Sequence, residues 1–207
     1  MNYGVSLDTI EDAKQALKRA WPEIKNECRA VLGSELHYQA QIYHCLRTSG
    51  SVPILQLGMN VKMYIENCQT ELFQMLDEKK HEDFRGGFET IPDIVIFTSN
   101  IKADWRRRNR DKTLISTLLA IEVKASERHR GRLRPGEICG DISKLSAHRE
   151  KVRAKASDFL PVMMIIDTTD ELSERMLPSA IEVSKAHAHD SEVEFMYVSR
   201  SVSFSSL

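Results

Sequence analysis

Three charged residues lie in apolar, strand-like surroundings, where a charge is costly. Asp93 precedes the run Ile-Val-Ile-Phe, and Glu122 and Lys124 interrupt the run Leu-Leu-Ala-Ile-Glu-Val-Lys-Ala at 118–125. An ion buried in a protein costs on the order of several kcal/mol unless it is paired or binds a metal. Because side chains alternate along a strand, Glu122 and Lys124 share one face, and the opposite face is apolar. We therefore expect these charges to have a chemical role.

Asp93 and Glu122 converge at one end of a sheet if their two strands pair as neighbours. Two adjacent carboxylates raise each other's pKa unless a cation lies between them. Oxygen ligands without histidine or cysteine suit Mg²⁺ or Mn²⁺ rather than zinc. A lysine beside such a metal, here Lys124, is placed to orient water and to stabilise charge on a phosphoryl group. The pattern indicates metal-dependent chemistry on a phosphate ester.

A third acid, Glu35, lies at the start of a helix predicted over 34–47, where Ser34 is a suitable N-cap. Glu35 shares its helical stripe with Gln39 and Ile42, so an otherwise core-facing side presents a carboxylate. An acid in a first turn also complements the helix dipole. A role in the site and a purely structural role both remain open for Glu35.

The elements that must position these residues follow from hydrophobic periodicity, which predicts one α/β sheet covered by helices. Pro22 is expected to kink the first helix or to start a second one. Residues 67–82 are ambiguous, with a helix indicated at 70–80, and the basic segments 99–113 and 126–136 are predicted to be loops. Helices are predicted over 9–32, 34–47, 137–156 and 170–187, and strands over 54–65, 89–98, 114–125, 161–167 and 193–199.

Length and composition are those of one globular domain. The chain has 207 residues and a formal net charge of −1. We expect an N-terminal helical extension at 1–33, the main domain at 34–200 and a flexible tail at 201–207. The first 15 residues lack the basic segment and the following apolar segment of a secretion signal. No run approaches 18 apolar residues. Both observations favour a cytoplasmic protein without membrane contact.

The remaining motifs give little indication of function. The four cysteines lack a CxxC pair, which is typical of free thiols and disfavours a cysteine-ligated zinc site. His187 and His189 point to different sides of a helix, so they are interpreted as surface residues. The sequence has no P-loop, no G-x-S-x-G and no G-x-G-x-x-G motif.

The order of the charged motifs resembles that of the PD-(D/E)XK nuclease superfamily, the restriction-endonuclease-like fold. Asp93 follows Pro92, and after 28 intervening residues comes Glu122-x-Lys124, each motif on a predicted strand. The resemblance covers roughly residues 34–167. It implies an αβββαβ core with a mixed central sheet flanked by helices, to which the N-terminal helices are additional.

The resemblance also implies roles for individual residues and a cofactor. The cofactor would be Mg²⁺, for which Mn²⁺ substitutes. Lys124 would be the catalytic lysine, and Lys144 would contact the phosphate backbone or support the site. The implied metal ligands are the carboxylates of Asp93, Glu122 and Glu35 and the carbonyl oxygen of Val123. The implied catalytic residues are these three acids together with Lys124.

The helix after the Glu-x-Lys motif carries a further match to these nucleases. It opens with Gly-Asp-Ile-Ser-Lys-Leu at 140–145, where they often have an Asp-x-x-Lys-Leu-like signature. Asp141, Lys144, Leu145 and His148 stand at i, i+3, i+4 and i+7, so they share one face of that helix.

Positive charge is concentrated in two segments that adjoin the motif strands. Segment 101–112 has six basic and two acidic residues, and segment 124–134 has five basic and one acidic, so each carries +4. Such segments can follow a phosphate backbone, and the alternative is that they only keep the surface soluble. Trp105 is available to stack on an unpaired base. The predicted nucleic-acid contacts, besides Lys144, are Arg106, Arg107, Arg108, Arg128, Arg130, Arg132 and Arg134.

The sequence therefore predicts a metal-dependent nuclease, with a DNA endonuclease of defence, restriction, mobile-element or repair type favoured over action on RNA. Cutting both strands of a duplex usually requires two sites, so a homodimer or larger assembly, alone or with other subunits, is expected. Two alternatives remain open. One is a non-catalytic module of the same fold that binds nucleic acid or protein, and the other is a structural ion pair in an unrelated α/β protein.

Overall fold

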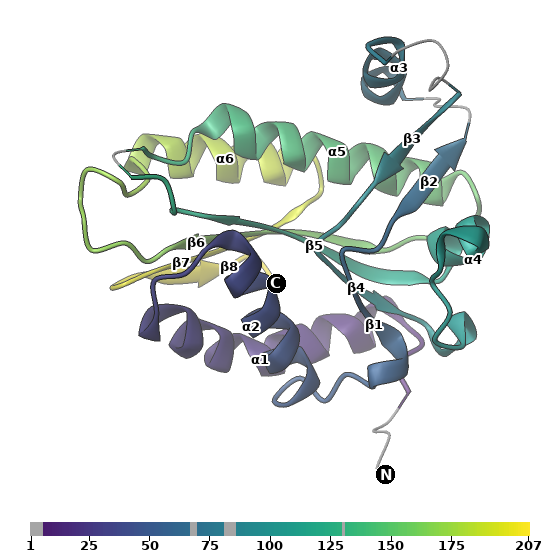
Figure 1. The fold of residues 1–207 in the computed structure, drawn as a ribbon, viewed down its shortest axis with the longest axis horizontal. Helices are drawn as coiled ribbons and strands as arrows, with labels where there is room; N and C mark the ends of the chain where they lie inside the picture. Colours follow the sequence, from purple (N-terminus) through teal and green to yellow (C-terminus); the bar gives the residue numbers. More distant parts are fainter. Residues whose placement is uncertain (1–5, 67–69, 81–85, 130) are drawn as a thin grey trace.

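A six-stranded mixed sheet forms the centre of the protein, with helices on both of its faces (Figure 1). The computed structural model describes residues 6–66, 70–80, 86–129 and 131–207. The strands of the sheet, in spatial order, are β1 (Leu57–Met59), β4 (Ile94–Phe97), β5 (Thr117–Ala125), β6 (Leu160–Asp167), β7 (Glu194–Ser199) and β8 (Ser203–Ser205). The predicted α/β class is confirmed.

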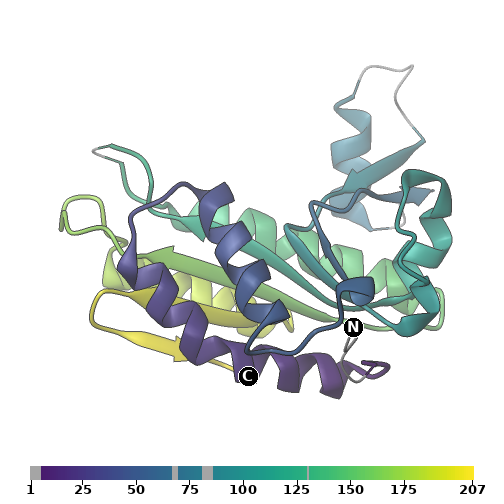
Figure 2. The ribbon, with the colours of Figure 1, turned by 60° about the horizontal axis from the view of Figure 1, so that its bottom comes forward.

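Helices α1 and α2 cover one face of the sheet, and α5 and α6 cover the other (Figures 1 and 2). The α-helices are α1 (Ile10–Ala30), α2 (Glu35–Arg47), α3 (Glu71–Glu78), α4 (Arg110–Ile115), α5 (Pro135–Arg153) and α6 (Pro178–Asp190). Short 3-10 helices are η1 (Ile54–Gln56), η3 (Ser99–Ile101) and η4 (Arg107–Asn109). Among the described residues, no helix has the length and apolar character needed to cross a membrane.

Strand β5 is the junction between the antiparallel and the parallel part of the sheet. It pairs with β4 antiparallel and with β6 parallel, and β6 pairs with β7 parallel. The edge strands β1 and β8 are antiparallel to their neighbours. Every residue of β6 is buried, as expected for a strand covered on both faces. The C-terminal ends of β5, β6 and β7 therefore lie at the same edge of the sheet.

Alternation along the strands divides the core into two layers. Ile94 and Ile121 pack on the α1 and α2 side, and Val95 and Ala120 pack on the α5 and α6 side. Helix α1 contributes fully buried residues such as Leu17 to the first layer. The predicted extension at 1–33 therefore shares its core with the main domain.

A buried acid ties the ends of three strands together. Asp167, at the end of β6, is fully buried. One of its carboxylate oxygens accepts a hydrogen bond from the hydroxyl of Ser126 at 2.6 Å. The other accepts from the hydroxyl of Tyr197 on β7 at 2.6 Å and from the backbone N–H of Met176 at 3.1 Å. The network fixes the chain immediately beyond β5.

Two predicted strands are each divided between the main sheet and a separate two-stranded sheet. β2 (Met63–Glu66) pairs antiparallel with β3 (Gly87–Thr90). The predicted strand 54–65 breaks after β1 because Asn60 has a left-handed φ of 52°. The predicted strand 89–98 breaks before β4 because Pro92 has no N–H to donate to a ladder. The small sheet and α3 stand beside α5 (Figure 1).

Three further predictions differ from the structure, and the ambiguous stretch proves partly helical. The ambiguous stretch 67–82 contains α3, and its residues 67–69, 81 and 82 lie outside the described part of the chain. Residues 110–115, predicted as loop and strand, form α4. Helix α6 begins at Pro178 rather than at 170, as suits a proline in a first helical turn. The tail predicted to be flexible contains β8, which pairs with β7. Helix α1 continues through Pro22, so no second helix starts there, and a kink at Pro22 stays a prediction.

Candidate active site

Asp93 and Glu122 lie opposite each other at the end of two neighbouring strands, as the sequence predicted. The antiparallel register pairs Ile94 with Ile121, so Asp93, just before β4, faces Glu122 on β5. Asp93 is 7% exposed, and its carboxylate accepts a hydrogen bond from the backbone N–H of Val123 at 2.7 Å. This bond fixes the Asp93 carboxylate against β5. The role predicted for the Val123 carbonyl remains a prediction.

Lys124 lies at the centre of three carboxylates from three different elements. Its Nζ is 3.4 Å from Glu122 Oε1, 3.5 Å from Glu35 Oε1 and 3.4 Å from Asp141 Oδ2. Glu122 is on β5, Glu35 begins α2 and Asp141 is on α5, so helices from both faces of the sheet reach the same ammonium group. Glu35 therefore belongs to this cluster, through Lys124.

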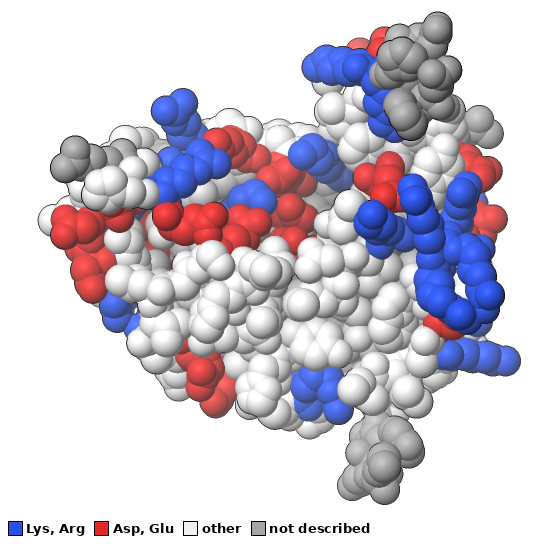
Figure 3. All heavy atoms as spheres, viewed as in Figure 1, with Lys and Arg blue, Asp and Glu red and all other residues white. Residues whose placement is uncertain are grey.

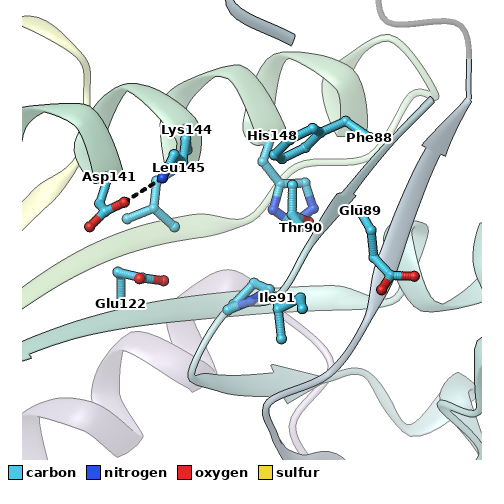
Figure 4. Close-up of a pocket in the computed structure, with 10 residues that line it drawn as sticks. Phe88, Glu89, Thr90, Ile91, Glu122, Asp141, Lys144, Leu145 and His148 are labelled. Atoms are coloured by element: carbon cyan, nitrogen blue, oxygen red, sulfur yellow. Dashed lines mark hydrogen bonds and ion pairs between the residues drawn. The ribbon is translucent and has the colours of Figure 1, made fainter. Parts of the chain in front are cut away.

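Asp141 also belongs to the site, although it was not among the site residues predicted from the sequence. Its carboxylate contacts Lys124 and also Lys144 Nζ at 2.8 Å. Figure 4 shows Asp141 and Lys144 on α5 facing Glu122 on β5 across a pocket. The motif at 140–145 contained the necessary signal, because Asp141 and Lys144 were placed on one helical face.

Local capping interactions set the position of Glu35. The hydroxyl of Ser34 accepts a hydrogen bond from the backbone N–H of His37, which confirms the expected N-cap. The carboxylate of Glu127, from the segment after β5, accepts from the backbone N–H of Glu35 at 2.7 Å. An acid at a helix N-terminus interacts favourably with the helix dipole. Glu127 thus fastens the start of α2 to the end of β5.

Burial and charge crowding shift the pKa values of the site. Burial, reinforced by the charge of Asp93, raises the pKa of Glu122 to about 8. Burial also raises the pKa of Asp93 to about 6, although the hydrogen bond from Val123 opposes the shift. For Lys124, burial lowers the pKa, but the four surrounding carboxylates outweigh it and raise the pKa overall. The site holds more negative charge than its lysine neutralises.

The donor chemistry of the site fits a hard divalent cation. No group of three or more Asp, Glu, His or Cys side chains in the described parts of the chain is arranged to hold a metal ion. Mg²⁺, however, commonly binds through one or two carboxylates and completes its shell with water and substrate phosphate. Asp93 and Glu122 are such a pair, and a cation between them would offset the charge repulsion that adds to burial in raising the pKa of Glu122.

A cleft of about 610 Å³ opens next to Lys124. Its charged lining is mixed, with four acids and three bases: Glu35, Glu127, Glu137, Asp141, Lys124, Arg128 and Lys144. Figure 3 shows acidic side chains along the hollow between α2 and α5, with basic side chains among them. We call this surface around Lys124 the acidic cleft. Its carboxylates attract cations, and Arg128 and Lys144 add positive charge beside them.

The first basic segment lies away from the cleft. Residues 101–112 connect the C-terminal end of β4 to the N-terminal end of β5. Asp93 and Lys124 lie together at the other end of this strand pair, where β4 begins and β5 ends. Figure 3 shows the corresponding blue cluster around α4, at the other end of the molecule. Of the described residues, Arg106 and Arg108 pair with Asp104, and Arg107 pairs with Glu89. The segment does not adjoin the candidate site.

The second basic segment does adjoin the site, because it follows β5 directly. Arg128 lines the cleft and pairs with Glu137 at 2.8 Å. Arg132 donates a hydrogen bond to the carbonyl of Arg175 at 2.8 Å, and Arg134 immediately precedes α5. Arg130 lies outside the described residues. Arg128 and Lys144 are therefore the predicted nucleic-acid contacts that line the cleft.

Trp105 is packed against the protein itself. Its ring stacks on Phe97 with centroids 5.5 Å apart, beside the core layer of α5 and α6. The ring is partly buried, and it lies in the segment that leads away from the cleft. Stacking of Trp105 on a base remains a prediction that this packing does not favour.

Comparisons with protein-family models, curated proteins and solved structures found no match to this chain.

Proposed function

We propose that the protein is a metal-dependent nuclease that hydrolyses phosphodiester bonds in nucleic acid, with DNA favoured over RNA. The observation that carries the proposal is the convergence of Asp93, Glu122 and Lys124 at one end of β4 and β5. Charges retained in an otherwise apolar sheet are costly, and a catalytic cluster is the reason for them that fits best.

The order of elements supports a restriction-endonuclease-like core. The succession α2, β1, β4, β5, α5 and β6 agrees with the αβββαβ order of PD-(D/E)XK nucleases, with the small sheet and α3 inserted after β1. The pairing of β5 with β4 antiparallel and with β6 parallel gives the mixed sheet that the resemblance implies.

Asp93 and Glu122 are the residues proposed to hold Mg²⁺ or Mn²⁺. Such an ion would supply positive charge at the scissile phosphate and would make water a stronger nucleophile at neutral pH. Because Asp93 is fixed by the N–H of Val123, one carboxylate is oriented before any ion or substrate arrives. The carbonyl of Val123 and the carboxylate of Glu35 remain candidates for additional ligands.

Lys124 is proposed to orient the attacking water and to donate hydrogen bonds to the phosphate as charge develops on it. Its raised pKa keeps it an ammonium, so it acts as a cation and hydrogen-bond donor rather than as a base. Glu35 and Asp141 hold Nζ in place from two sides, and Lys144 stands at the rim to contact a phosphate.

A non-catalytic binding module remains the competing function. The observation in its favour is that Lys124 already has three carboxylate partners, which is also the arrangement of a structural ion cluster. Such a module would bind nucleic acid or protein without cutting. A homodimer or larger assembly, which supplies two sites for a duplex, is part of the nuclease proposal only.

Plasmid digestion distinguishes the two functions. We expect cutting with Mg²⁺ or Mn²⁺, none with EDTA, and a loss of about a thousandfold in Lys124→Ala, because an oriented cation at the phosphate is lost. Lys18→Ala, at an exposed position on α1, is the matched control and should cut normally. Equal cutting by Lys124→Ala contradicts the mechanism, and tight binding without cutting under either metal favours the module.

A further inference from the structure

A second pocket opens beside the candidate active site, between α5 and the small sheet (Figure 4). It has a volume of about 160 Å³. The end of the pocket next to the candidate active site is lined by Glu122, Asp141 and Lys144. Its lining is mixed, and the apolar part consists of Phe88, Ile91, Pro92 and Leu145. Its polar lining away from Glu122 and Asp141 includes Thr90 on the small sheet and His148 on α5 (Figure 4).

His148 and Thr90 are buried polar side chains without partners. His148 is 1% exposed and Thr90 is 8% exposed. Within the described residues, the two ring nitrogens of His148 have no hydrogen-bond partner, and the hydroxyl of Thr90 has none either. Buried polar atoms are nearly always hydrogen-bonded, because leaving them unpaired costs free energy. Two such residues on one pocket indicate a ligand that completes their hydrogen bonds.

The protonation state of His148 defines what this ligand must offer. Burial lowers the pKa of His148 to about 4, so the ring is neutral near pH 7. A neutral imidazole has one donor and one acceptor nitrogen, and a threonine hydroxyl can act as either. Phe159, whose ring centroid is 4.8 Å from that of His148, supports the imidazole from behind. The pocket therefore presents donors and acceptors together at Thr90 and His148, and Glu89, the charged lining residue on that side, is paired with Arg107.

Size and shape favour one flat ring. A cavity of about 150 Å³ is known to hold benzene, so about 160 Å³ accommodates a single six-membered ring. Phe88 and Leu145 provide aromatic and aliphatic walls for the ring faces. A pyrimidine base has this size and also carries donors and acceptors on its edge, which a purely apolar ring lacks.

We propose that this pocket binds one unpaired pyrimidine base of the substrate, hydrogen-bonded by Thr90 and His148 next to the candidate cleavage site. The inference rests on the proposed function and specifies its substrate. A paired base is stacked and its edge is occupied, so the base must come from a single strand or a locally opened duplex. The phosphate attached to this nucleotide then lies at the end lined by Glu122, Asp141 and Lys144.

The test is fluorescence anisotropy with labelled single strands of about 12 nucleotides, a length within the usual site sizes. Lys124→Ala protein with Mg²⁺ is used, so that the strands stay intact. Oligothymidylate is compared with an abasic strand of equal length, which has the same phosphates and no bases. We expect oligothymidylate to bind about tenfold more tightly, as hydrogen bonds and wall contacts to one base allow.

Two substitutions in the Lys124→Ala background remove the polar groups and keep the shape. Thr90→Val and His148→Phe should each reduce the preference to about threefold or less, with the affinity for the abasic strand unchanged. Both variants should melt at or above the temperature of the parent, because each removes an unpaired buried polar group. Thr98→Val is the matched control, since its hydroxyl is also buried and unpaired but lies outside the pocket.

The possible outcomes separate this inference from the proposed function. Equal binding of the two strands, or a preference that survives both substitutions, overturns the base pocket even if the wild-type protein cuts DNA. Tighter binding of oligodeoxyadenylate than of oligothymidylate overturns the pyrimidine assignment. A preference lost in both variants supports the pocket, and it does so even if the wild-type protein fails to cut with Mg²⁺ or Mn²⁺, in which case hydrolysis alone is contradicted.

Discussion

The two ends of β5 carry opposite kinds of surface. At its C-terminal end is the acidic cleft, where Lys124 pairs with three carboxylates. Before its N-terminal end is a basic patch formed by residues 101–112, whose arginines pair with nearby acids such as Asp104 and Glu89. Both regions are clusters of charge, but only the first is buried in an apolar sheet. Burial of charge, rather than its amount, is the better indicator of a site.

The largest expected difference between the two regions is in catalysis. Asp93→Asn removes a proposed ligand charge while keeping the hydrogen-bonding shape, so cleavage with Mg²⁺ should fall by about a thousandfold, several kcal/mol at the transition state. Arg107→Ala in the basic patch should change the rate at saturating DNA by less than about threefold. Single-turnover cleavage measures both, and similar losses in the two variants would remove the distinction between the regions.

The next effect concerns stability, and its sign follows from Glu122. The folded protein raises the pKa of this carboxyl from its ordinary value of 4.5 to about 8. The folded state thus binds the proton more tightly, so stability falls as the pH rises from 4.5 to 8 and the folded-state carboxyl ionises. Glu122→Gln removes this loss and should stabilise the metal-free protein above pH 8.

The stabilisation of Glu122→Gln at pH 9 should be about 2 kcal/mol, given about 1.4 kcal/mol per pKa unit and a discount for a side chain that is 20% exposed. That corresponds to about 4–8 °C in melting temperature. Thermal melts in EDTA at pH 5 and pH 9 measure it. A gain that is equal at the two pH values would mean that ionisation of Glu122 is not the cause.

The smallest effect is on binding to duplex DNA. Each phosphate contact contributes about 0.9 to the slope of log affinity against log salt. Arg128→Ala with Lys144→Ala, at the cleft, should reduce that slope by about 2. The triple alanine variant of Arg106, Arg107 and Arg108 should weaken binding and reduce the slope by only about 1, because these arginines are already paired.

Asp104→Asn provides the reciprocal control for this comparison. Hydrogen bonds from Arg106 hold the pKa of Asp104 well below its usual range, so the carboxylate is charged and holds Arg106 and Arg108. Removing that charge should release the two guanidinium groups and tighten DNA binding. If the triple variant changes the slope more than the cleft variant does, the basic patch rather than the cleft carries the phosphate contacts.

The buried charges of the site could be predicted from sequence because they contradict their surroundings. Asp93, Glu122 and Lys124 stand in apolar strands, and strand alternation was sufficient to place Glu122 and Lys124 on one face. Their convergence then needed only the pairing of β4 with β5. Asp141 was harder to assign, because an acid in a polar helical stretch is ordinary until the helix is seen to pack against β5.

Other features depended on three-dimensional information that a local pattern lacks. The segment 101–112 follows a motif strand in sequence, but it leaves from the end opposite Asp93, so adjacency along the chain did not mean adjacency in space. The division of strand 54–65 at Asn60 depends on a left-handed backbone angle that the composition only suggests. The pocket at His148 arises from the small sheet, whose position depends on tertiary contacts rather than on periodicity.

The hydrogen bonds of Asp167 have a consequence for how the molecule can adapt to a substrate. Because Ser126 and Tyr197 are both held by this one carboxylate, the sheet edge beneath Lys124 is a rigid floor. Any widening of the cleft must then come from its walls, by small shifts of α2 and α5 toward or away from each other. Amide hydrogens at the end of β5 should accordingly exchange more slowly than those in the first turns of the two helices.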